Sequence, residues 1–399
     1  MKLAVLTCGM LPIPAVQGGA VENLIDFYLE YNNKKRLHDI TVFSPLDAEA
    51  ETHSALSSDV NHYTFIDTTS LKARIGRRIF KFTHSPSDYY NYFIEYYFEK
   101  VYRQLKRVDY DYIILENCPG YAYKLSQRGY NNLILHLHNE LLHSNSKYHD
   151  IIFNSLVKVL TVSDFIKKRV STIQPSEKIQ TVYNGIDIHH FSARESSEVN
   201  RQTIGFSETD FVIVYSGRIN KDKGVSELID AMLQLEKFPT IKLMILGSSF
   251  FNDSTGEDVF INNLKNKAEA IKDRIVFTGF IPYRQVPAYL HIADIAVLPS
   301  MWEEPFGLTI VEAMAAGLPL ITTRSGGIPE ICEGVATIVD KENVVNNLAS
   351  AILDLYQHPE KREQMAKASI ERAKLFDKEK FAKNFFDNIK SLHNVNSQS

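Results

Sequence analysis

The chain has 399 residues, 44% of them hydrophobic and 23% charged, which is the composition of an ordinary globular protein. The formal net charge of −4 gives no overall basic field that would attract nucleic acid. The three cysteines, Cys8, Cys118 and Cys332, are far apart and form no CxxC pair. This spacing argues against a disulfide framework or a thiolate metal site and favours a reducing cytoplasm.

Short apolar runs alternate with helical patterns along the whole chain. In the first half, the predicted strands are residues 2–7, 40–44, 112–117, 133–138, 159–163 and 179–185. In the second half, they are residues 211–217, 241–247, 274–279, 295–300, 319–323 and 336–340. Continuous apolar strands separated by helices indicate parallel sheets covered on both faces. Because a dozen strands exceed one comfortable sheet, we predict an α/β protein with two Rossmann-like, doubly wound domains.

The polar segment 192–210 has few large apolar residues and marks the predicted domain boundary. We therefore expect an N-terminal domain over 1–195 and a C-terminal domain over 205–375, followed by a helix and a frayed tail over 376–399. That helix, 376–392, carries apolar residues at helical spacing and is expected to return to the N-terminal domain. Ligands of open α/β sheets bind beyond the carboxyl ends of the strands, so two such domains facing each other would form a cleft.

Three segments beyond predicted strand ends suit an anionic ligand. Gly18 and Gly19 precede a helix, where backbone N–H groups can approach an anion, although such a pair is more often simple loop geometry. Arg218 and Lys223 flank a loop before another helix. They are either solvated side chains or a clamp for a diphosphate. Two cations could neutralise a diphosphate without a metal, since a charge pair at 4 Å contributes about 4 kcal/mol in a partly buried site.

The third segment follows strand 295–300 and places Glu304 just before a helix predicted at about 307–316 and Glu312 within it. The first-turn amides, at Phe306 to Thr309, can bind oxygen atoms. Carboxylates suit hydrogen bonds from sugar hydroxyls. The alternative is that Glu304 is a residue of the helix cap and Glu312 a surface residue.

These residues resemble the signature of the GT-B nucleotide-sugar glycosyltransferases, specifically glycosyltransferase family 4. The resemblance rests on Glu304-x7-Glu312 within PSMWEEPFGLTIVEAMAAGLPLITTRSGGIPEI (299–331) and extends to five further motifs in the family's order. These are GGAVE (18–22), HNE (138–140), VYNGID (182–187), GRINKDKG (217–224) and FTGFIP (277–282). Residues 45–110 match no motif of the family.

The resemblance implies a role for each matching residue in binding the donor. Glu304 resembles the glutamate that contacts hydroxyls of the donor sugar, and Glu312 the one that holds the ribose. Arg218 and Lys223 resemble the pair that binds the diphosphate and stabilises the leaving group.

The other matching positions complete the implied donor site. Gly19, preceded by Gly18, resembles the glycine whose backbone meets the phosphates. The amides of Phe306, Gly307, Leu308 and Thr309 would face phosphate and sugar, and Phe280 and Ile281 would read the base through backbone atoms. His138 would lie near the donor sugar and orient it. His136 shares its strand face but matches the motif less well.

The implied activity is a retaining, hexosyltransferase-type transfer from a UDP- or GDP-sugar to a glycan or lipid-linked saccharide, in bacterial-type polysaccharide or glycoconjugate synthesis. We expect no cofactor and no metal. Asp109-Tyr110-Asp111 has the DxD spacing of a metal site but starts a strand, and His189-His190 has no placed carboxylate or cysteine partner. A sugar-nucleotide epimerase of the same fold and a catalytically silent nucleotide-sugar binding protein remain alternatives. A phosphorylase would need a lysine-bound pyridoxal phosphate, which no motif supports.

Residues 71–82, LKARIGRRIFKF, form a basic amphipathic pattern without an acidic residue. Such a helix either binds an anionic membrane surface or packs, solvated, on the N-terminal sheet. No segment approaches the roughly 20 apolar residues that span a bilayer. The N-terminal MKLAVLTCGM is too short for a signal peptide and predicts a buried strand. The expected location is therefore cytoplasmic, with peripheral attachment to the inner face of the membrane left open.

Overall fold

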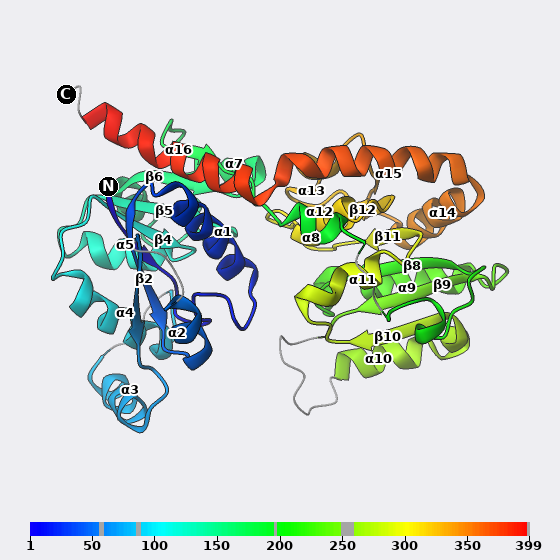
Figure 1. Ribbon diagram of the computed structural model, residues 1–399, viewed down its shortest axis with the longest axis horizontal. Helices are drawn as coiled ribbons and strands as arrows, with labels where there is room; N and C mark the ends of the chain where they lie inside the picture. The colour runs from blue at the N-terminus through cyan, green and yellow to red at the C-terminus, as the bar shows by residue number, and fades with distance from the viewer. Residues whose placement is uncertain (56–59, 85–88, 195–197, 249–258, 397–399) are drawn as a thin grey trace. The chain divides into compact units, whose positions relative to one another are not determined.

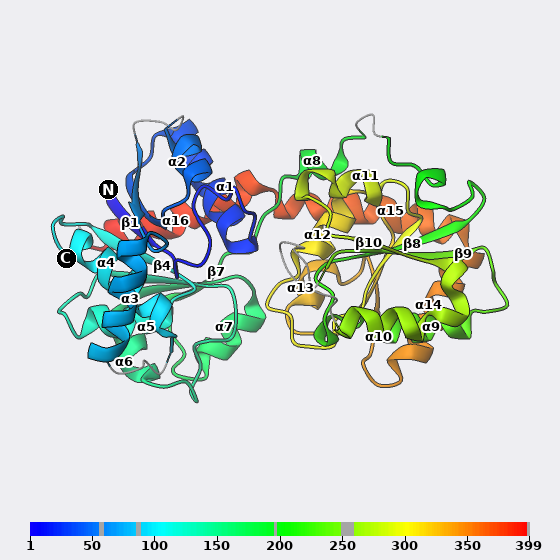
Figure 2. The ribbon, with the colours of Figure 1, turned by 90° about the horizontal axis from the view of Figure 1, so that it is seen from below.

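The computed structural model describes residues 1–55, 60–84, 89–194, 198–248 and 259–396. The chain divides into two compact units. The N-terminal unit comprises Met1–Gly185 and Lys378–Ser399, and the C-terminal unit comprises Ile186–Asp377. Each unit contains one parallel sheet with helices around it (Figures 1 and 2).

Within the described residues, the N-terminal sheet has seven strands in the order β3-β2-β1-β4-β5-β6-β7. The strands are β1 (Lys2–Leu6), β2 (Asp39–Pro45), β3 (Asn61–Ile66), β4 (Tyr112–Glu116), β5 (Leu133–Leu137), β6 (Leu156–Thr161) and β7 (Ile179–Thr181). The central strands β4 and β5 are buried along their whole length, as expected for strands covered on both faces. The edge strand β3 was not predicted, because its alternating sequence NHYTFI lacks the continuous apolar run of the others.

The helices of this unit pack on both faces of the sheet. They are α1 (Ala20–Lys35), α2 (Ala48–Ser54), α3 (Leu71–Thr83), α4 (Tyr92–Leu105), α5 (Pro119–Ser126), α6 (His149–Ser155), α7 (Asp164–Ser171) and α16 (Lys378–Asn396). Helix α16 packs against α1, with the rings of Tyr28 and Phe385 stacked at 4.4 Å between centroids. The predicted return of the last helix to the N-terminal domain is confirmed. The helix continues to Asn396, beyond the expected end at residue 392, and residues 397–399 of the predicted frayed tail lie outside the described part.

Within the described residues, the C-terminal sheet has six parallel strands in the order β10-β9-β8-β11-β12-β13. They are β8 (Phe211–Ser216), β9 (Ile241–Leu246), β10 (Ile275–Gly279), β11 (Ile295–Leu298), β12 (Leu320–Thr323) and β13 (Thr337–Val339). The helices are α8 (Ile188–Ser192), α9 (Val225–Gln234), α10 (Val259–Lys267), α11 (Val286–Leu290), α12 (Leu308–Ala315), α13 (Ile328–Cys332), α14 (Val344–Gln357) and α15 (Pro359–Ala373). Two doubly wound α/β sheets were predicted, and both are present.

The division between the units lies earlier than the sequence suggested. Helix α8 packs against α11 and α12, so residues from Ile186 onward belong to the C-terminal unit. Its buried Phe191 contacts the ring of Tyr283, which attaches the segment to that unit. The polar composition of 192–210 therefore marks a surface segment of the C-terminal unit, and residues 195–197 of it lie outside the described part.

The order of strands reverses between β1 and β4 in one sheet and between β8 and β11 in the other. Open α/β sheets bind their ligands where the strand order reverses, beyond the carboxyl ends of the strands. Nearly all of the predicted site residues follow β1, β5, β8, β10 or β11. None of the described helices has the length and hydrophobicity needed to cross a bilayer.

Candidate functional site

Lys223 and Glu304, which are 81 residues apart in the sequence, form an ion pair in the C-terminal unit. Lys223 ends a short 3-10 turn after β8, and Glu304 lies in the loop after β11. The same Glu304 carboxylate oxygen accepts a hydrogen bond from the Ser300 hydroxyl at 3.0 Å. Their side chains are only 20% and 11% exposed, so the carboxylate is largely shielded from water. A partly buried pair of opposite charges at a switch point is suited to a ligand that carries both phosphate and hydroxyl groups.

Glycines let the loops that carry this pair approach each other. Gly224 has a φ of +72°, and a Cβ there would lie 1.9 Å from the Pro299 carbonyl oxygen. Gly326 has a φ of +53°, and a Cβ there would lie 2.2 Å from the Glu304 carbonyl oxygen. The Gly327 N–H donates to that carbonyl at 2.7 Å. The backbone of Glu304 is therefore held by the 326–327 turn while its side chain faces Lys223.

The amino end of α12 lies beside the loop that carries the cations. A Cβ on Gly217, which precedes Arg218, would lie 4.0 Å from the Thr309 methyl group. Gly307 precedes the helix with a φ of +101°, and the buried Phe306 ring packs against Phe376 at 5.7 Å. An α-helix leaves its first-turn N–H groups without intrahelical acceptors, which here concerns Leu308 and Thr309. An anion can thus meet helix amides and cations from one side.

Glu312 lies one turn further along α12 and is 7% exposed. No hydrogen bond to its carboxyl group occurs among the described residues. Burial raises the pKa of Glu312 to about 7, because no opposite charge offsets the loss of water. A buried carboxyl group without a partner is costly to a fold unless a ligand supplies the missing donors.

The remaining predicted donor residues of this unit are more exposed. Arg218 is exposed in the loop after β8, and its carbonyl accepts a hydrogen bond from the Tyr215 hydroxyl at 2.8 Å. Phe280 is 43% exposed and Ile281 half-buried, directly after β10. Tyr283 was not predicted as a site residue. Burial raises its pKa, and the charge of Glu312 adds to that shift. Tyr283 therefore lies near Glu312.

In the N-terminal unit, Gly18 and Gly19 have φ values of +76° and +108° and end the loop between β1 and α1. A Cβ on Gly19 would lie 2.2 Å from a carboxylate oxygen of Glu22. Burial raises the pKa of Glu22, and the charge of Glu116 adds to the shift. The positive φ and this close contact favour glycine at position 19. The acid in the first turn of α1 is Glu22.

His138, directly after β5, belongs to a buried cluster that the sequence analysis did not predict as a whole. We call it the Glu116 cluster, and it consists of Tyr28, Glu116, His136 and His138. One Glu116 oxygen lies 3.0 Å from His136 Nδ1 and 3.0 Å from His138 Nε2, and the other accepts from the Tyr28 hydroxyl at 3.0 Å. Glu116 is the last residue of β4. An acidic residue directly after four apolar strand residues was the sequence signal that could have identified it as a site residue.

The charge state of the Glu116 cluster follows from its environment. Burial alone would raise the pKa of Glu116, but the charge and hydrogen bond of His136, together with His138, outweigh it and lower the pKa to about 2. Burial, followed by the charge of His136, lowers the pKa of His138 to about 4. At neutral pH the cluster therefore contains an ionised Glu116 and an uncharged His138.

Glu116, His136 and His138 are also the one group of three potential metal ligands among the described residues. The two motifs that the sequence analysis set aside have structural roles. Asp111 accepts the Lys2 N–H at 2.7 Å at the opposite, amino end of the sheet. His190 packs against the ring of Tyr283 at 5.8 Å, within α8.

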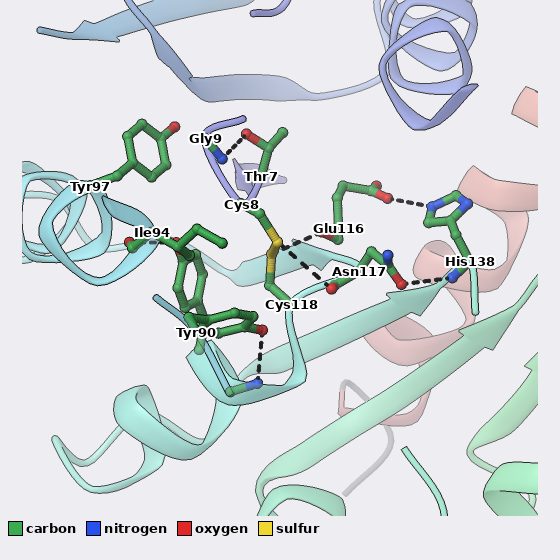
Figure 3. The surroundings of a disulfide bond; sticks show 12 residues. Thr7, Cys8, Gly9, Tyr90, Ile94, Tyr97, Glu116, Asn117, Cys118 and His138 are labelled. Atoms are coloured by element: carbon green, nitrogen blue, oxygen red, sulfur yellow. Dashed lines mark hydrogen bonds and ion pairs between the residues drawn. A yellow bond between two sulfur atoms is a disulfide. The ribbon is translucent and has the colours of Figure 1, made fainter. Parts of the chain in front are cut away.

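The spacing of the cysteines argued against a disulfide framework, and this expectation is wrong for two of them. Cys8 follows β1 and Cys118 follows β4, and a disulfide joins them across a sequence separation of 110 residues (Figure 3). Because β1 and β4 are neighbouring parallel strands, their carboxyl ends bring the two thiols together. Cys332 is free and buried. Figure 3 shows Glu116 and His138 beside the disulfide.

Comparison with known proteins gives two family matches that follow one another along the chain. Residues 32–190 match the family described as Glycosyltransferase Family 4. Residues 196–372 match the family described as Glycosyl transferases group 1.

Individual relatives match over long stretches. Spore coat protein SA of Bacillus subtilis (strain 168) is 28% identical over 94% of each chain. The lipopolysaccharide 1,2-N-acetylglucosaminetransferase of Salmonella typhimurium is 26% identical over 62% of this chain and 65% of its own. The solved structure of Anabaena HepE in complex with UDP-glucose has a TM-score of 0.72, covers 98% of this chain and 99% of its own, and is 20% identical.

Proposed function

The chain belongs to the GT-B glycosyltransferases of family 4, and from this premise we propose that it transfers a sugar, with retention, from a UDP- or GDP-sugar to a glycan or lipid-linked saccharide. The observation that carries the proposal is the Lys223–Glu304 ion pair beside the amino end of α12. A cation, a carboxylate and helix amides that lie close together support a sugar diphosphate as the ligand.

In this proposal, each polar group of the donor has a partner in the C-terminal unit. Lys223 and Arg218 bind the diphosphate together with the amides that begin α12, from Phe306 through Gly307 and Leu308 to Thr309. Glu304 accepts hydrogen bonds from hydroxyls of the transferred sugar. Lys223 pairs with Glu304, so a diphosphate that binds the lysine competes with the carboxylate and leaves it available to the sugar.

Glu312 accepts hydrogen bonds from the ribose, and the backbone at Phe280 and Ile281 contacts the base. The bound UDP-glucose of HepE supports a UDP-sugar as the first donor to test. In the N-terminal unit, Gly19 offers its backbone N–H group to the phosphates and His138 orients the donor sugar. The Gly18 N–H cannot do the same in this conformation, because it donates to the Ala15 carbonyl at 2.9 Å. We propose that no metal is needed, because two cations and helix amides already counter the charge of the diphosphate.

Retention follows from a front-face substitution. The bond between the anomeric carbon and the diphosphate oxygen breaks, and the acceptor oxygen bonds to the same face of that carbon. The acceptor proton moves to the departing diphosphate oxygen, while Lys223 and Arg218 stabilise the negative charge there. A double displacement would need a carboxylate on the far face of the sugar. Glu304 does not take that part here, because it binds hydroxyls.

Helix α3 supports an acceptor at an anionic lipid surface. Its exposed apolar side chains are Leu71, Ile75, Ile79 and Phe82, which are 74%, 50%, 58% and 90% exposed. The helix packs against α4 through Ala73 and Phe80, which are buried. The four exposed apolar side chains therefore face away from the core. In Figure 1, α3 lies at the end of the N-terminal unit away from α16. Exposed Lys72, Arg74, Arg78 and Lys81 complement anionic headgroups.

Vesicle sedimentation tests this membrane contact. We expect binding to vesicles with phosphatidylglycerol and little binding to pure phosphatidylcholine. Phe82→Ser should weaken binding roughly tenfold or more, since burying one Phe contributes about 1.5–3 kcal/mol. Leu375→Ser, at a 53% exposed leucine of the C-terminal unit, is the matched control. Equal binding by both variants, or none by the wild type, would remove the membrane from the proposal.

Thermal unfolding with UDP-, GDP-, ADP- and TDP-sugars, without metal, tests donor binding. A donor at a hundred times its dissociation constant stabilises by about 2.7 kcal/mol, roughly 5–10 °C for domains of this size. Lys223→Ala should abolish the shift, whereas Lys221→Ala, an exposed lysine in the same turn, should keep it. The absence of a shift with every donor would contradict the proposal.

A further inference from the structure

His138 is the residue of the N-terminal unit that the proposed function places against the donor sugar. Its ring has two nitrogens, and the proton can reside on either of them when the ring is uncharged. The nitrogen without the proton accepts a hydrogen bond, and the other donates one. Which nitrogen faces the sugar therefore decides what the sugar must offer in return.

The Glu116 carboxylate fixes the proton of His138. An ionised carboxylate only accepts hydrogen bonds, so the His138 Nε2 that lies 3.0 Å from it carries the hydrogen. The backbone N–H of His138 donates to the Asn117 side-chain oxygen at 3.1 Å, which holds the residue at the end of β5 (Figure 3). No hydrogen bond to His138 Nδ1 occurs within the described part of the chain. That nitrogen is the one left to meet a ligand.

The rest of the cluster agrees with this assignment. His136 Nδ1 donates to the same oxygen of Glu116, and its Nε2 is buried without a partner. The Tyr28 hydroxyl donates to the second Glu116 oxygen. The Glu116 carboxylate thus accepts three hydrogen bonds and donates none.

We infer that Glu116 is a positioning residue that holds His138 as its uncharged Nε2–H tautomer, so that Nδ1 accepts a hydrogen bond from a hydroxyl group of the donor sugar. The inference rests on the proposed function for the identity of the ligand. It also sets a specificity: the contacted position of the sugar must carry a hydrogen-bond donor. A sugar with a carboxylate at the contacted position would be disfavoured. Its negative charge would face the lone pair of His138 Nδ1, and the Glu116 carboxylate lies on the other side of the ring.

The same three side chains could instead bind a metal ion. A histidine that ligates a metal almost always donates its other ring N–H to a partner, and His136 Nε2 has none. The N···O separations of 3.0 Å are those of ordinary hydrogen bonds. The geometry therefore favours a hydrogen-bonded cluster over a metal centre.

Nitrogen-15 NMR of histidine-labelled protein tests the tautomer without any assay of activity. The His138 signals, assigned by their loss in His138→Gln, should show a protonated Nε2 and an unprotonated Nδ1 in the wild-type protein. A proton on Nδ1 would overturn the inference. So would stabilisation of the wild-type protein by ZnCl2 or MnCl2 that is lost in Glu116→Gln, since the cluster would then be a metal site.

Kinetics of donor hydrolysis test the consequence for the sugar. In Glu116→Gln, the amide NH2 can face His138 Nε2 and move the ring proton to Nδ1. We expect kcat/KM for the donor to fall about tenfold or more, the size expected for a lost hydrogen bond, together with the change of tautomer. Tyr28→Phe removes the third donor but leaves the His138 contact, so it should keep the tautomer and most of the activity.

The outcomes separate this inference from the proposed function. If Glu116→Gln changes the tautomer but leaves kcat/KM unchanged while UDP-sugars still stabilise the protein, the contact with the sugar is wrong and the function stands. If no nucleotide sugar binds the wild type, the function fails and the contact with the sugar falls with it. The NMR result then still decides whether Glu116 sets the tautomer.

Discussion

The two units hold their polar groups in opposite ways. Among the described residues of the C-terminal unit, the Glu312 carboxyl group has no hydrogen-bond partner, and the Glu304 carboxylate accepts from only Lys223 and Ser300. In the N-terminal unit, Glu116 accepts from three buried side chains. Groups with unused capacity can bind a ligand, whereas a satisfied cluster fixes geometry before the ligand arrives. The contrast suggests that the C-terminal unit provides most of the affinity and the N-terminal unit provides orientation.

The largest expected effect tests the C-terminal side of this contrast. In Glu304→Gln, the side chain keeps its size but loses its charge, so it accepts sugar hydroxyls more weakly and no longer pairs with Lys223. We expect kcat/KM for the donor to fall about 10²–10³-fold, as on removal of one preorganised contact to the transition state. Steady-state kinetics with the donor identified by thermal shift measure this.

Glu303→Gln is the matched control, because the neighbouring Glu303 is 52% exposed and pairs with Lys341 at 2.6 Å. An exposed ion pair contributes about 0.2–1 kcal/mol to stability, so kcat/KM should change little. Near-wild-type turnover in Glu304→Gln would break the contrast, because the buried carboxylate would then have no part in the reaction.

The Cys8–Cys118 disulfide gives the second prediction, now for the N-terminal side. A cross-link over 110 residues restricts the unfolded chain strongly, and such bonds typically contribute about 2–4 kcal/mol. Reduction, or Cys8→Ser, should therefore lower the stability of the N-terminal unit by about that amount. Hydrogen exchange resolved by peptide should show faster exchange in β1 and β4 than in β8 and β11.

Two internal controls accompany this experiment. Cys332→Ser removes the free, buried cysteine and should leave the response to reductant unchanged. Trp302, the single tryptophan, lies in the C-terminal unit, so its fluorescence reports that unit alone. Equal destabilisation of both units by reductant would show that they unfold together. The disulfide would then not stabilise the N-terminal unit separately from the C-terminal unit.

Much of the fold was predictable because its signal is local. The twelve predicted strands are all present, since a continuous apolar run between helices has few alternatives in a parallel sheet. The edge strand β3 was missed, because partly exposed strands need no such run. The boundary between the units was misplaced, because the attachment of α8 depends on packing against distant helices that local composition does not reveal.

The residues of the candidate site that belong to a family motif were predictable from the sequence, and the others were not. Glu304 and Lys223 came from the family motifs, and the structure brings them into contact. The place of Glu116 depends on Tyr28, 88 residues away, and on two histidines that follow it by 20 and 22 residues. Likewise, Cys8 and Cys118 meet only because β1 and β4 are adjacent. Such contacts follow from the order of the strands in the sheet, which local sequence patterns do not reveal.

The smallest expected effect concerns Glu312, whose pKa burial raises to about 7. Ribose hydroxyls donate best to the ionised carboxylate, so donor binding should lower this pKa and release a proton. Affinity should then rise with pH up to about 7 and fall below it by as much as about tenfold per pH unit. The raised pKa of Glu312 also makes the stability of the ligand-free protein depend on pH. As the pH rises from 4.5 through 7, the unfolded chain loses this proton before the folded protein does, so the free energy of unfolding decreases.

Calorimetric titration with a nucleotide sugar at pH 6, 7 and 8, in two buffers of different ionisation enthalpy, measures the released proton directly. A nucleotide sugar is the appropriate ligand, since its diphosphate carries no group that titrates in this range. Glu312→Gln should bind more weakly at pH 8 and show no proton release. If the wild type releases no proton either, Glu312 does not meet the ligand in its ionised form. The unpaired carboxyl group would then be a cost of the fold, and the contrast between the units would rest on Lys223 and Glu304 alone.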